Sequence, residues 1–157
     1  MITFSKIDIA GASQVYILGL SQGQDIFGYY YDATGEHAFI DSHDVVTTLD
    51  AGASSTYTYI QGIAPTNEAF GYYINDAGQH GFVSTGRSVM TIDGSATAYS
   101  TVVLGVTAAG DIVGEYFDLT GGHGFSETNG VIRVIDAVPG FGKTYAQWRF
   151  PLRSRKS

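Results

Sequence analysis

The sequence predicts an all-β domain made of three four-stranded repeats, and three observations support this prediction. A pattern of glycine, aromatic and histidine residues recurs three times at a fixed spacing of 43 residues. Each copy contains four short segments rich in Tyr, Ile, Val, Phe and Thr, which favour strands, with tight-turn residues between them. No window has the apolar periodicity of a helix. A fixed period of this size is typical of a repeat architecture.

The strands can be placed from the second copy. They are expected at Thr58–Ile63, Ala69–Ile74, Gly81–Ser84 and Ser88–Ile92. Turn residues lie between them, at positions 65–67, 75–78 and 85–86. Four strands in about 43 residues is the usual size of a β-propeller blade.

Three sets of equivalent residues have expected structural roles. Glycine inside a strand suggests that a neighbouring backbone or side chain approaches closely, and this applies to Gly28, Gly71 and Gly114. The expected core anchors are Phe39, Phe82 and Phe125. The residues expected to pack between adjacent units are Tyr30, Tyr73 and Tyr116.

The period also sets the domain boundaries. Residues 1–147 are predicted to form one repeat domain with units at about 14–56, 57–99 and 100–142. Partial units flank it: residues 2–8 resemble a fourth strand, and residues 143–147 begin another copy. Residues 148–157 form a basic tail outside the pattern.

Two closed architectures fit three such units. A propeller closes with about four to eight blades, so three blades would need a partner chain. A β-trefoil closes three copies of four strands within one chain of about this length. The propeller is the preferred fold and the β-trefoil is the alternative. The propeller predicts a homo-oligomer, most simply a dimer that joins two sets of three blades into a six-bladed ring.

Composition excludes several function classes. The chain of 157 residues has no cysteine, so thiol catalysis, disulfides and cysteine-ligated zinc are excluded. Residues 1–147 contain 4 basic and 15 acidic side chains, a balance that argues against nucleic-acid binding. No apolar run has the roughly 20 residues that a membrane span needs. Residues 1–6 lack the features of a signal peptide, so the sequence leaves the localisation unknown.

The three equivalent histidines are the sharpest chemical feature. One hypothesis is that His37, His80 and His123 converge on zinc or copper. The preferred interpretation is that each one bonds within its own unit, because it follows a turn Asp or Asn at a constant distance. Equivalent residues of separate blades are also too far apart to share one ion, unless they line the axis. His43 is expected to be an exposed turn residue. No metal site and no cofactor are therefore predicted.

Other motifs give no catalytic residues. The turns that begin at Asp32, Asn75 and Asp118 have too few carboxylates for calcium loops. The recurring Asp8, Asp50, Asp93 and Asp136 are expected to be hydrogen-bond acceptors at turns or strand ends. The eleven tyrosines and one tryptophan could include platforms for sugar stacking, although packing explains most of them.

The units resemble the HAF repeat of predicted bacterial extracellular proteins. The triplet that names this family is present as His37-Ala38-Phe39 and as His-Gly-Phe at 80–82 and 123–125. Gly-Asp-Ile-Val-Gly-Glu-Tyr-Phe-Asp at 110–118 also matches its pattern. The resemblance covers about residues 2–147 and implies propeller-like blades and an exported setting. It implies no established activity and transfers no catalytic residue.

These observations predict a non-enzymatic binding or structural module for carbohydrate or protein. The alternative is a hydrolase or lyase with a site on the central face of an oligomeric propeller. The candidate residues recur at the same position of every repeat, which favours the binding or structural module, because catalytic residues usually break the symmetry of a repeat.

Overall fold

The fold is all-β. A computed structural model of the chain describes residues 6–52, 54–85 and 88–136, and these residues form twelve strands and no helix. The strands of the first unit are β1 (Gln14–Leu20), β2 (Ile26–Tyr31), β3 (Glu36–Ser42) and β4 (Val45–Leu49). Those of the second are β5 (Tyr57–Ile63), β6 (Ala69–Asn75), β7 (Gly78–Thr85) and β8 (Ser88–Ile92). Those of the third are β9 (Ser100–Val106), β10 (Ile112–Asp118), β11 (Gly121–Thr128) and β12 (Val131–Ile135).

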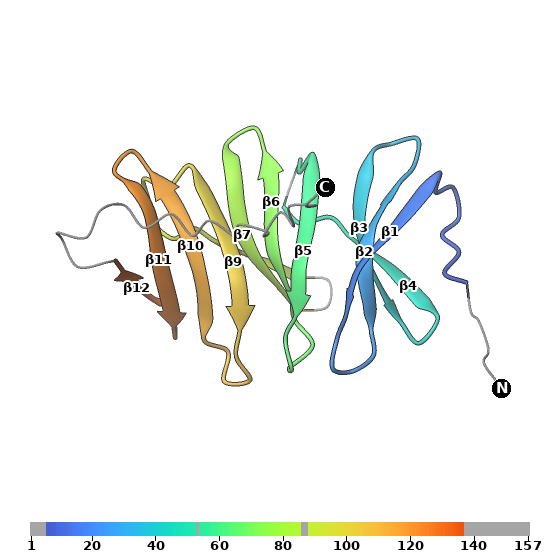
Figure 1. The fold of residues 1–157 in the computed structure, drawn as a ribbon. Helices are drawn as coiled ribbons and strands as arrows, with labels where there is room; N and C mark the ends of the chain where they lie inside the picture. Colours follow the sequence, from blue (N-terminus) through green and yellow to red (C-terminus); the bar gives the residue numbers. More distant parts are fainter. Residues whose placement is uncertain (1–5, 53, 86–87, 137–157) are drawn as a thin grey trace, which may run out of the picture.

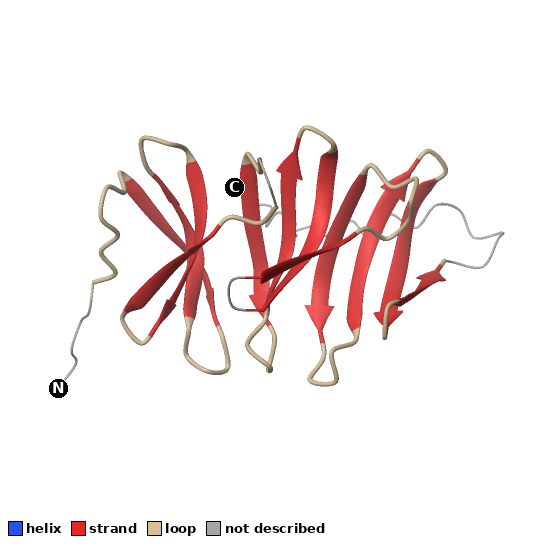
Figure 2. Cartoon of the chain, turned by 180° about the vertical axis from the view of Figure 1, so that it is seen from behind, coloured by secondary structure: helices blue, strands red, loops and turns tan. Residues whose placement is uncertain are grey.

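Each unit is an antiparallel meander in which consecutive strands pair. The first unit forms a sheet of its own. The second and third units form one eight-stranded sheet. They are linked by a single parallel residue pair, Gln79 with Ser100. The three units follow one another in chain order from blue through green to brown (Figure 1). The view from behind shows the same row of strands (Figure 2).

Most of the core lies between units, although Phe39 and Tyr30 of the first unit are buried outside these junctions. Each sheet has an N-side face, turned toward the preceding unit, and a C-side face, turned toward the following unit. Phe27 and Leu49 on the C-side face of the first unit pack against Ile60 and Phe82 on the N-side face of the second. A second cluster joins the second and third units in the same way, and includes Phe70, Ile92, Val103, Ile112 and Phe125.

The equivalent phenylalanines confirm their expected role as core anchors, and two of the three equivalent tyrosines confirm packing between units. Phe39, Phe82 and Phe125 are all fully buried. Tyr30 is buried but lies at no junction between described units, and its hydroxyl is bonded to Thr48 of its own unit. Tyr73 and Tyr116 are buried at the two junctions between units. A Cβ added at Gly52 would meet the Tyr73 ring, and one added at Gly94 would meet the Tyr116 ring. Glycine in each linker therefore makes room for the tyrosine of the next unit.

The in-strand glycines are also explained by close approach. A Cβ added at Gly71 would overlap the backbone carbonyl of Tyr59 on the neighbouring strand. Gly28 and Gly114 meet the carbonyls of Tyr16 and Val102 in the same way. Each contact lies beside a bulge in the first strand of its unit. A bulge bends its strand and increases the local twist, so a side chain at the facing position has no room.

The strands of the second unit agree with those expected to within one residue at each end, apart from an earlier start of β7 at Gly78. Strand β7 starts early because the turn after β6 contains only Asp76 and Ala77, so that Gly78, at φ +139°, already pairs with Asn75. In the part of the chain that the structure describes, the strand order follows open paths, and no sheet closes into a barrel or a propeller ring. Residues 6–8 are not in a strand, and the partial units at 2–5 and 143–147 and the tail at 148–157 lie outside the described residues. The described residues contain no helix that would be long and apolar enough for a membrane span.

Candidate functional site

Each of the three equivalent histidines is bonded within its own unit. His37 Nδ1 donates to Asp50 at 3.0 Å, His80 Nδ1 to Asp93 at 2.9 Å, and His123 Nδ1 to Asp136 at 2.8 Å. Each aspartate lies 13 residues after its histidine, just beyond the fourth strand of the unit. All three imidazole rings are mostly buried. The structure thus confirms that each histidine bonds within its own repeat.

The second ring nitrogen contacts the turn between the second and third strands. In the first unit, Thr34 Oγ1 lies 2.8 Å from His37 Nε2 and donates to Asp32 Oδ1 at 2.6 Å. Because its only proton goes to Asp32, the hydroxyl can only accept from Nε2. The ring then carries protons on both nitrogens, which is the imidazolium form. The third unit repeats this geometry with Asp118, Thr120 and His123.

Charge at these sites follows from the geometry. Partial burial opposes a positive charge on His37, but Asp50 and Asp32 outweigh it and raise its pKa. Hydrogen bonding to Asp136, against the same opposition from burial, raises the pKa of His123. Hydrogen bonds from Thr120 lower the pKa of Asp118 to about 2. In the first and third units, each triad of Asp, His and Asp therefore acts as a partly buried electrostatic clip. It joins the third strand to the turn before it and to the end of the fourth strand.

The second unit lacks half of this clip. Ala77 occupies the position of Thr34 and Thr120, and His80 Nε2 is buried with no hydrogen-bond partner in the described structure. Asn75 still accepts from the Ala77 N–H at 2.8 Å and shapes the turn. His43 is an exposed residue of the β3–β4 turn with φ +52°, as expected from the sequence.

The histidines do not converge. Within the described ranges 6–52, 54–85 and 88–136, no group of three or more His, Asp or Glu side chains has a geometry that could hold a metal ion. Both nitrogens of His37 and His123 are already bonded within their own units.

Two neighbouring groups of three tyrosines, whose rings contact one another within each group, are the most distinctive surface feature, and together we call them the tyrosine surface. Its members come from the first two units: Tyr16, Tyr29, Tyr31, Tyr57, Tyr59 and Tyr72. Tyr16 stacks on Tyr29 with ring centroids 4.8 Å apart, and Tyr59 stacks on Tyr72 at 5.4 Å. All six rings are partly or largely exposed.

Glu36 connects the two halves of the tyrosine surface. Its carboxylate, as a hydrogen-bond acceptor, together with partial burial, raises the pKa of Tyr31 to about 12. Burial raises the pKa values of Tyr29 and Tyr57, and the negative charge of Glu36 adds to both shifts. Glu36 Oε1 is itself buried without a hydrogen-bond partner among the described residues. The Glu36 carboxylate therefore has one oxygen free to accept a hydrogen bond from a ligand that contacts the neighbouring tyrosine rings.

A small cavity of about 270 Å³ adjoins this cluster at the junction of the first two units. Glu36 and Tyr57 contribute to both the cavity and the tyrosine surface. The rest of the lining is polar and comprises Thr34, Gly35, His37, Asp50, Ser55, Thr56 and Thr58. Aromatic faces beside carboxylates and hydroxyls form a chemically mixed site.

The third unit does not repeat the tyrosine surface. The positions of Tyr59 and Tyr72 hold Val102 and Glu115 there, and that of Tyr57 holds Ser100. The surface thus breaks the symmetry that the histidines and phenylalanines keep. A feature present in some units only is more simply explained by a specific function than by a shared structural need.

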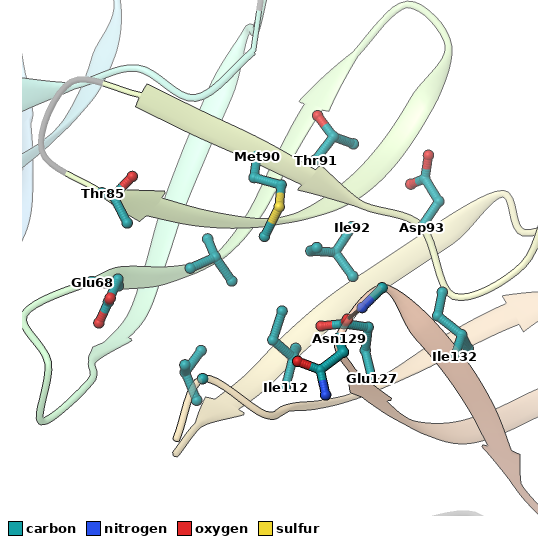
Figure 3. A pocket seen from close by; sticks show the side chains of 14 residues that line it. Glu68, Thr85, Met90, Thr91, Ile92, Asp93, Ile112, Glu127, Asn129 and Ile132 are labelled. Atoms are coloured by element: carbon teal, nitrogen blue, oxygen red, sulfur yellow. Dashed lines mark hydrogen bonds between the residues drawn. The ribbon is translucent and has the colours of Figure 1, made fainter. Parts of the chain in front are cut away.

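A larger cavity of about 500 Å³ lies between the second and third units. Figure 3 shows Met90 from β8 and Glu127 from β11 among its lining side chains. Val83, Ile92 and Ile112 make much of the lining apolar. This apolar lining is more typical of an imperfectly packed interface between two units than of a binding site for a polar ligand.

The sequence correctly predicted that Asp50, Asp93 and Asp136 accept hydrogen bonds and that the histidines contact the turn residues Asp32 and Asp118. It did not pair each histidine with the aspartate 13 residues later, and it missed the tyrosine surface. The constant offset of 13 residues between each histidine and an aspartate was a usable signal. The tyrosine surface gave no comparable signal, because its residues come from four strands of two units. Comparison with known proteins adds nothing to this assignment: no family model, no curated protein and no solved structure matches the chain.

Proposed function

We propose that the protein is a non-enzymatic, carbohydrate-binding module built from propeller blades, and that the tyrosine surface with Glu36 is its binding site. The carrying observation is the six partly exposed tyrosines, three of which interact with Glu36, whose carboxylate has one unsatisfied oxygen. Sugar rings present C–H faces that pack on aromatic rings and hydroxyls that donate to carboxylates. The adjoining polar cavity has room for one such ring.

The blade interpretation is supported by how the units pack. Each unit is a four-stranded meander, and its first strand lies against the face of the unit before it. This arrangement fits propeller blades better than a trefoil, whose strands share one barrel. Because a propeller ring takes about four to eight blades, the module is also proposed to be a homo-oligomer, with a dimer favoured. From the HAF-repeat resemblance, the module is further proposed to be an exported protein.

A glycan array followed by calorimetric titration tests the binding function. Tyr29→Ala and Tyr59→Ala should each weaken binding at least about tenfold, equivalent to roughly 1.4 kcal/mol. Tyr99→Ala is the matched control, because Tyr99 is exposed but lies outside the tyrosine surface. Circular dichroism would show that all three variants fold. Binding that survives both cluster substitutions would disprove this site.

A hydrolase or lyase is the second candidate, and one observation favours it. Glu36, His37 and Asp50 line the same cavity, and such groups can act as acid and base. His37 Nδ1 and Asp50 are already bonded to each other, which favours a structural role. Release of reducing sugar from oligosaccharides, abolished by Glu36→Gln, would replace the binding module with this enzyme.

A further inference from the structure

We infer that the N-side face of the first unit binds the C-side face of the third unit in a second copy of this chain. The inference rests on the blade arrangement proposed above and adds the residues that would form the junction. It does not involve the tyrosine surface: Tyr16 and Ile17 are neighbours on β1 and lie on opposite faces of the strand.

The N-side faces show a clear contrast in burial. Ile60 and Val103 are 1% and 0% exposed, because each packs against the preceding unit. The equivalent residue of the first unit, Ile17, is 54% exposed. Val15 is likewise exposed where Thr58 and Thr101 are buried. On the N-side face of the first unit, Ile17 and Val15 therefore lack the cover that a preceding unit gives to their equivalents, although Phe39 on the same face is fully buried.

The C-side faces show the converse contrast. Leu49 and Ile92 are each 7% exposed beneath the following unit, whereas the equivalent Ile135 is 57% exposed. Val113 is exposed where Phe27 and Phe70 are buried. Repeat arrays that end in solvent have a polar outer face on the end units. Here both outer faces keep apolar residues, which indicates that each is covered by a partner.

The two internal junctions show what kind of surface such a partner must present. In each, an Ile or Val on the first strand of one unit packs against a Leu or Ile at the end of the fourth strand of the unit before it. A second copy offers both faces. Ile17 of one copy would then lie against Val113 and Ile135 of the other. Two copies contribute six units, a number within the usual range for a closed ring.

An ion pair would accompany this contact. Met90 and Glu127 line one cavity at the junction of the second and third units (Figure 3). In the proposed junction, Arg133 takes the position of Met90, and Asp41 takes that of Glu127. Asp41 is buried with an oxygen that has no hydrogen-bond partner in the described structure. Arg133 is exposed and forms no ion pair with the described residues. The junction would satisfy both.

Sedimentation or light scattering of the 157-residue chain at micromolar concentration tests the inference. The expected particle contains two copies. Ile17→Asp and Ile135→Asp should each give a monomer of unchanged circular dichroism, because both side chains are already exposed within one copy. Leu119→Asp is the control, since this turn residue is 99% exposed and lies on neither face, and it should leave the mass unchanged.

Mixing gives the decisive result. Ile17→Asp keeps an intact C-side face and Ile135→Asp an intact N-side face, so an equimolar mixture should form a one-to-one complex that neither variant forms alone. Arg133→Glu should weaken self-association at least tenfold, and Arg133→Lys should largely restore it. A monomeric native chain, or an oligomer that is insensitive to Ile17→Asp, would overturn the inference. Mass and glycan affinity are separate measurements, so this junction and the carbohydrate site can fail independently.

Discussion

The hydroxyl of Thr58 accepts a 3.0 Å hydrogen bond from the backbone N–H of Ala51, in the linker that follows the unit before it. Both residues are buried. The next junction repeats the bond, with Thr101 accepting from Gly94 at 3.2 Å. A polar contact at the same place in each junction fixes how the first strand of one unit sits against the linker.

Thr58→Val should lower the free energy of unfolding by about 1–3 kcal/mol, because it leaves a buried N–H without a partner while keeping the side-chain volume. Urea denaturation followed by fluorescence measures the change. Thr66→Val provides the control: Thr66 is an exposed turn residue, so its substitution should stay within about 0.5 kcal/mol of the native value. Equal effects of the two substitutions would show that the Thr58–Ala51 bond contributes nothing specific.

Ala77→Thr should stabilise the protein by about 0.5–1.5 kcal/mol, the usual net value of a hydrogen bond. The new hydroxyl would reach the buried, unpartnered His80 Nε2, as Thr34 and Thr120 reach the histidines of their own units. The midpoint of urea unfolding reports the gain. Ala33→Thr, an exposed substitution in the corresponding turn of the first unit, should give no gain, and a similar gain from both would point to a general effect of threonine in turns.

Gly71→Ala should destabilise the fold by at least about 2 kcal/mol, since the added methyl group overlaps the Tyr59 carbonyl and the backbone must move. Thermal unfolding followed by circular dichroism is sufficient to detect this. Gly105→Ala is a matched in-strand comparison, because its Cβ would meet only a Val113 methyl group at 3.2 Å. A Gly105→Ala variant as unstable as Gly71→Ala would contradict the steric explanation.

The histidine clips predict a pH dependence of stability. The folded-state pKa values of His37 and His123 are raised above the ordinary histidine value of 6.5. Their contribution is therefore complete below about pH 6.5 and lost as the pH rises through the folded-state values. Asp118 has the opposite dependence, because its pKa is lowered from the ordinary value of 3.8 to about 2. Its contribution to stability is complete above about pH 3.8 and is lost as the pH falls toward 2.

The loss of stability caused by His123→Gln should consequently be larger at pH 5.5 than at pH 8.5, as measured by urea unfolding. His43→Asn is the control, because asparagine tolerates the positive φ of this exposed turn residue. It should give the same small change at both pH values. A His123→Gln effect that is independent of pH would mean that the ring stays neutral in the folded protein.

Much of the fold could be predicted from the sequence because its signals are local. Asp32, Thr34 and Gly35 form a turn from groups within four residues of one another, so the turn could be recognised without a structure. Segments rich in strand-favouring residues between tight-turn residues indicated the strands, and the constant period extended each assignment to the other units. His37 was correctly expected to bond within its unit, but its main partner, Asp50, depends on how the fourth strand returns beside the third.

The sequence by itself determined the units: their number, their four strands, their turns and the residues that each would bury. Only the tertiary structure decided how the units meet, because burial at a junction depends on the placement of two sheets and not on the pattern within either. Ile17 and Ile60 occupy the same position in the repeat and have the same side chain, yet one is exposed and the other buried. The tyrosine surface has the same origin, since Tyr29 and Tyr59 become neighbours only when the first two units pack together.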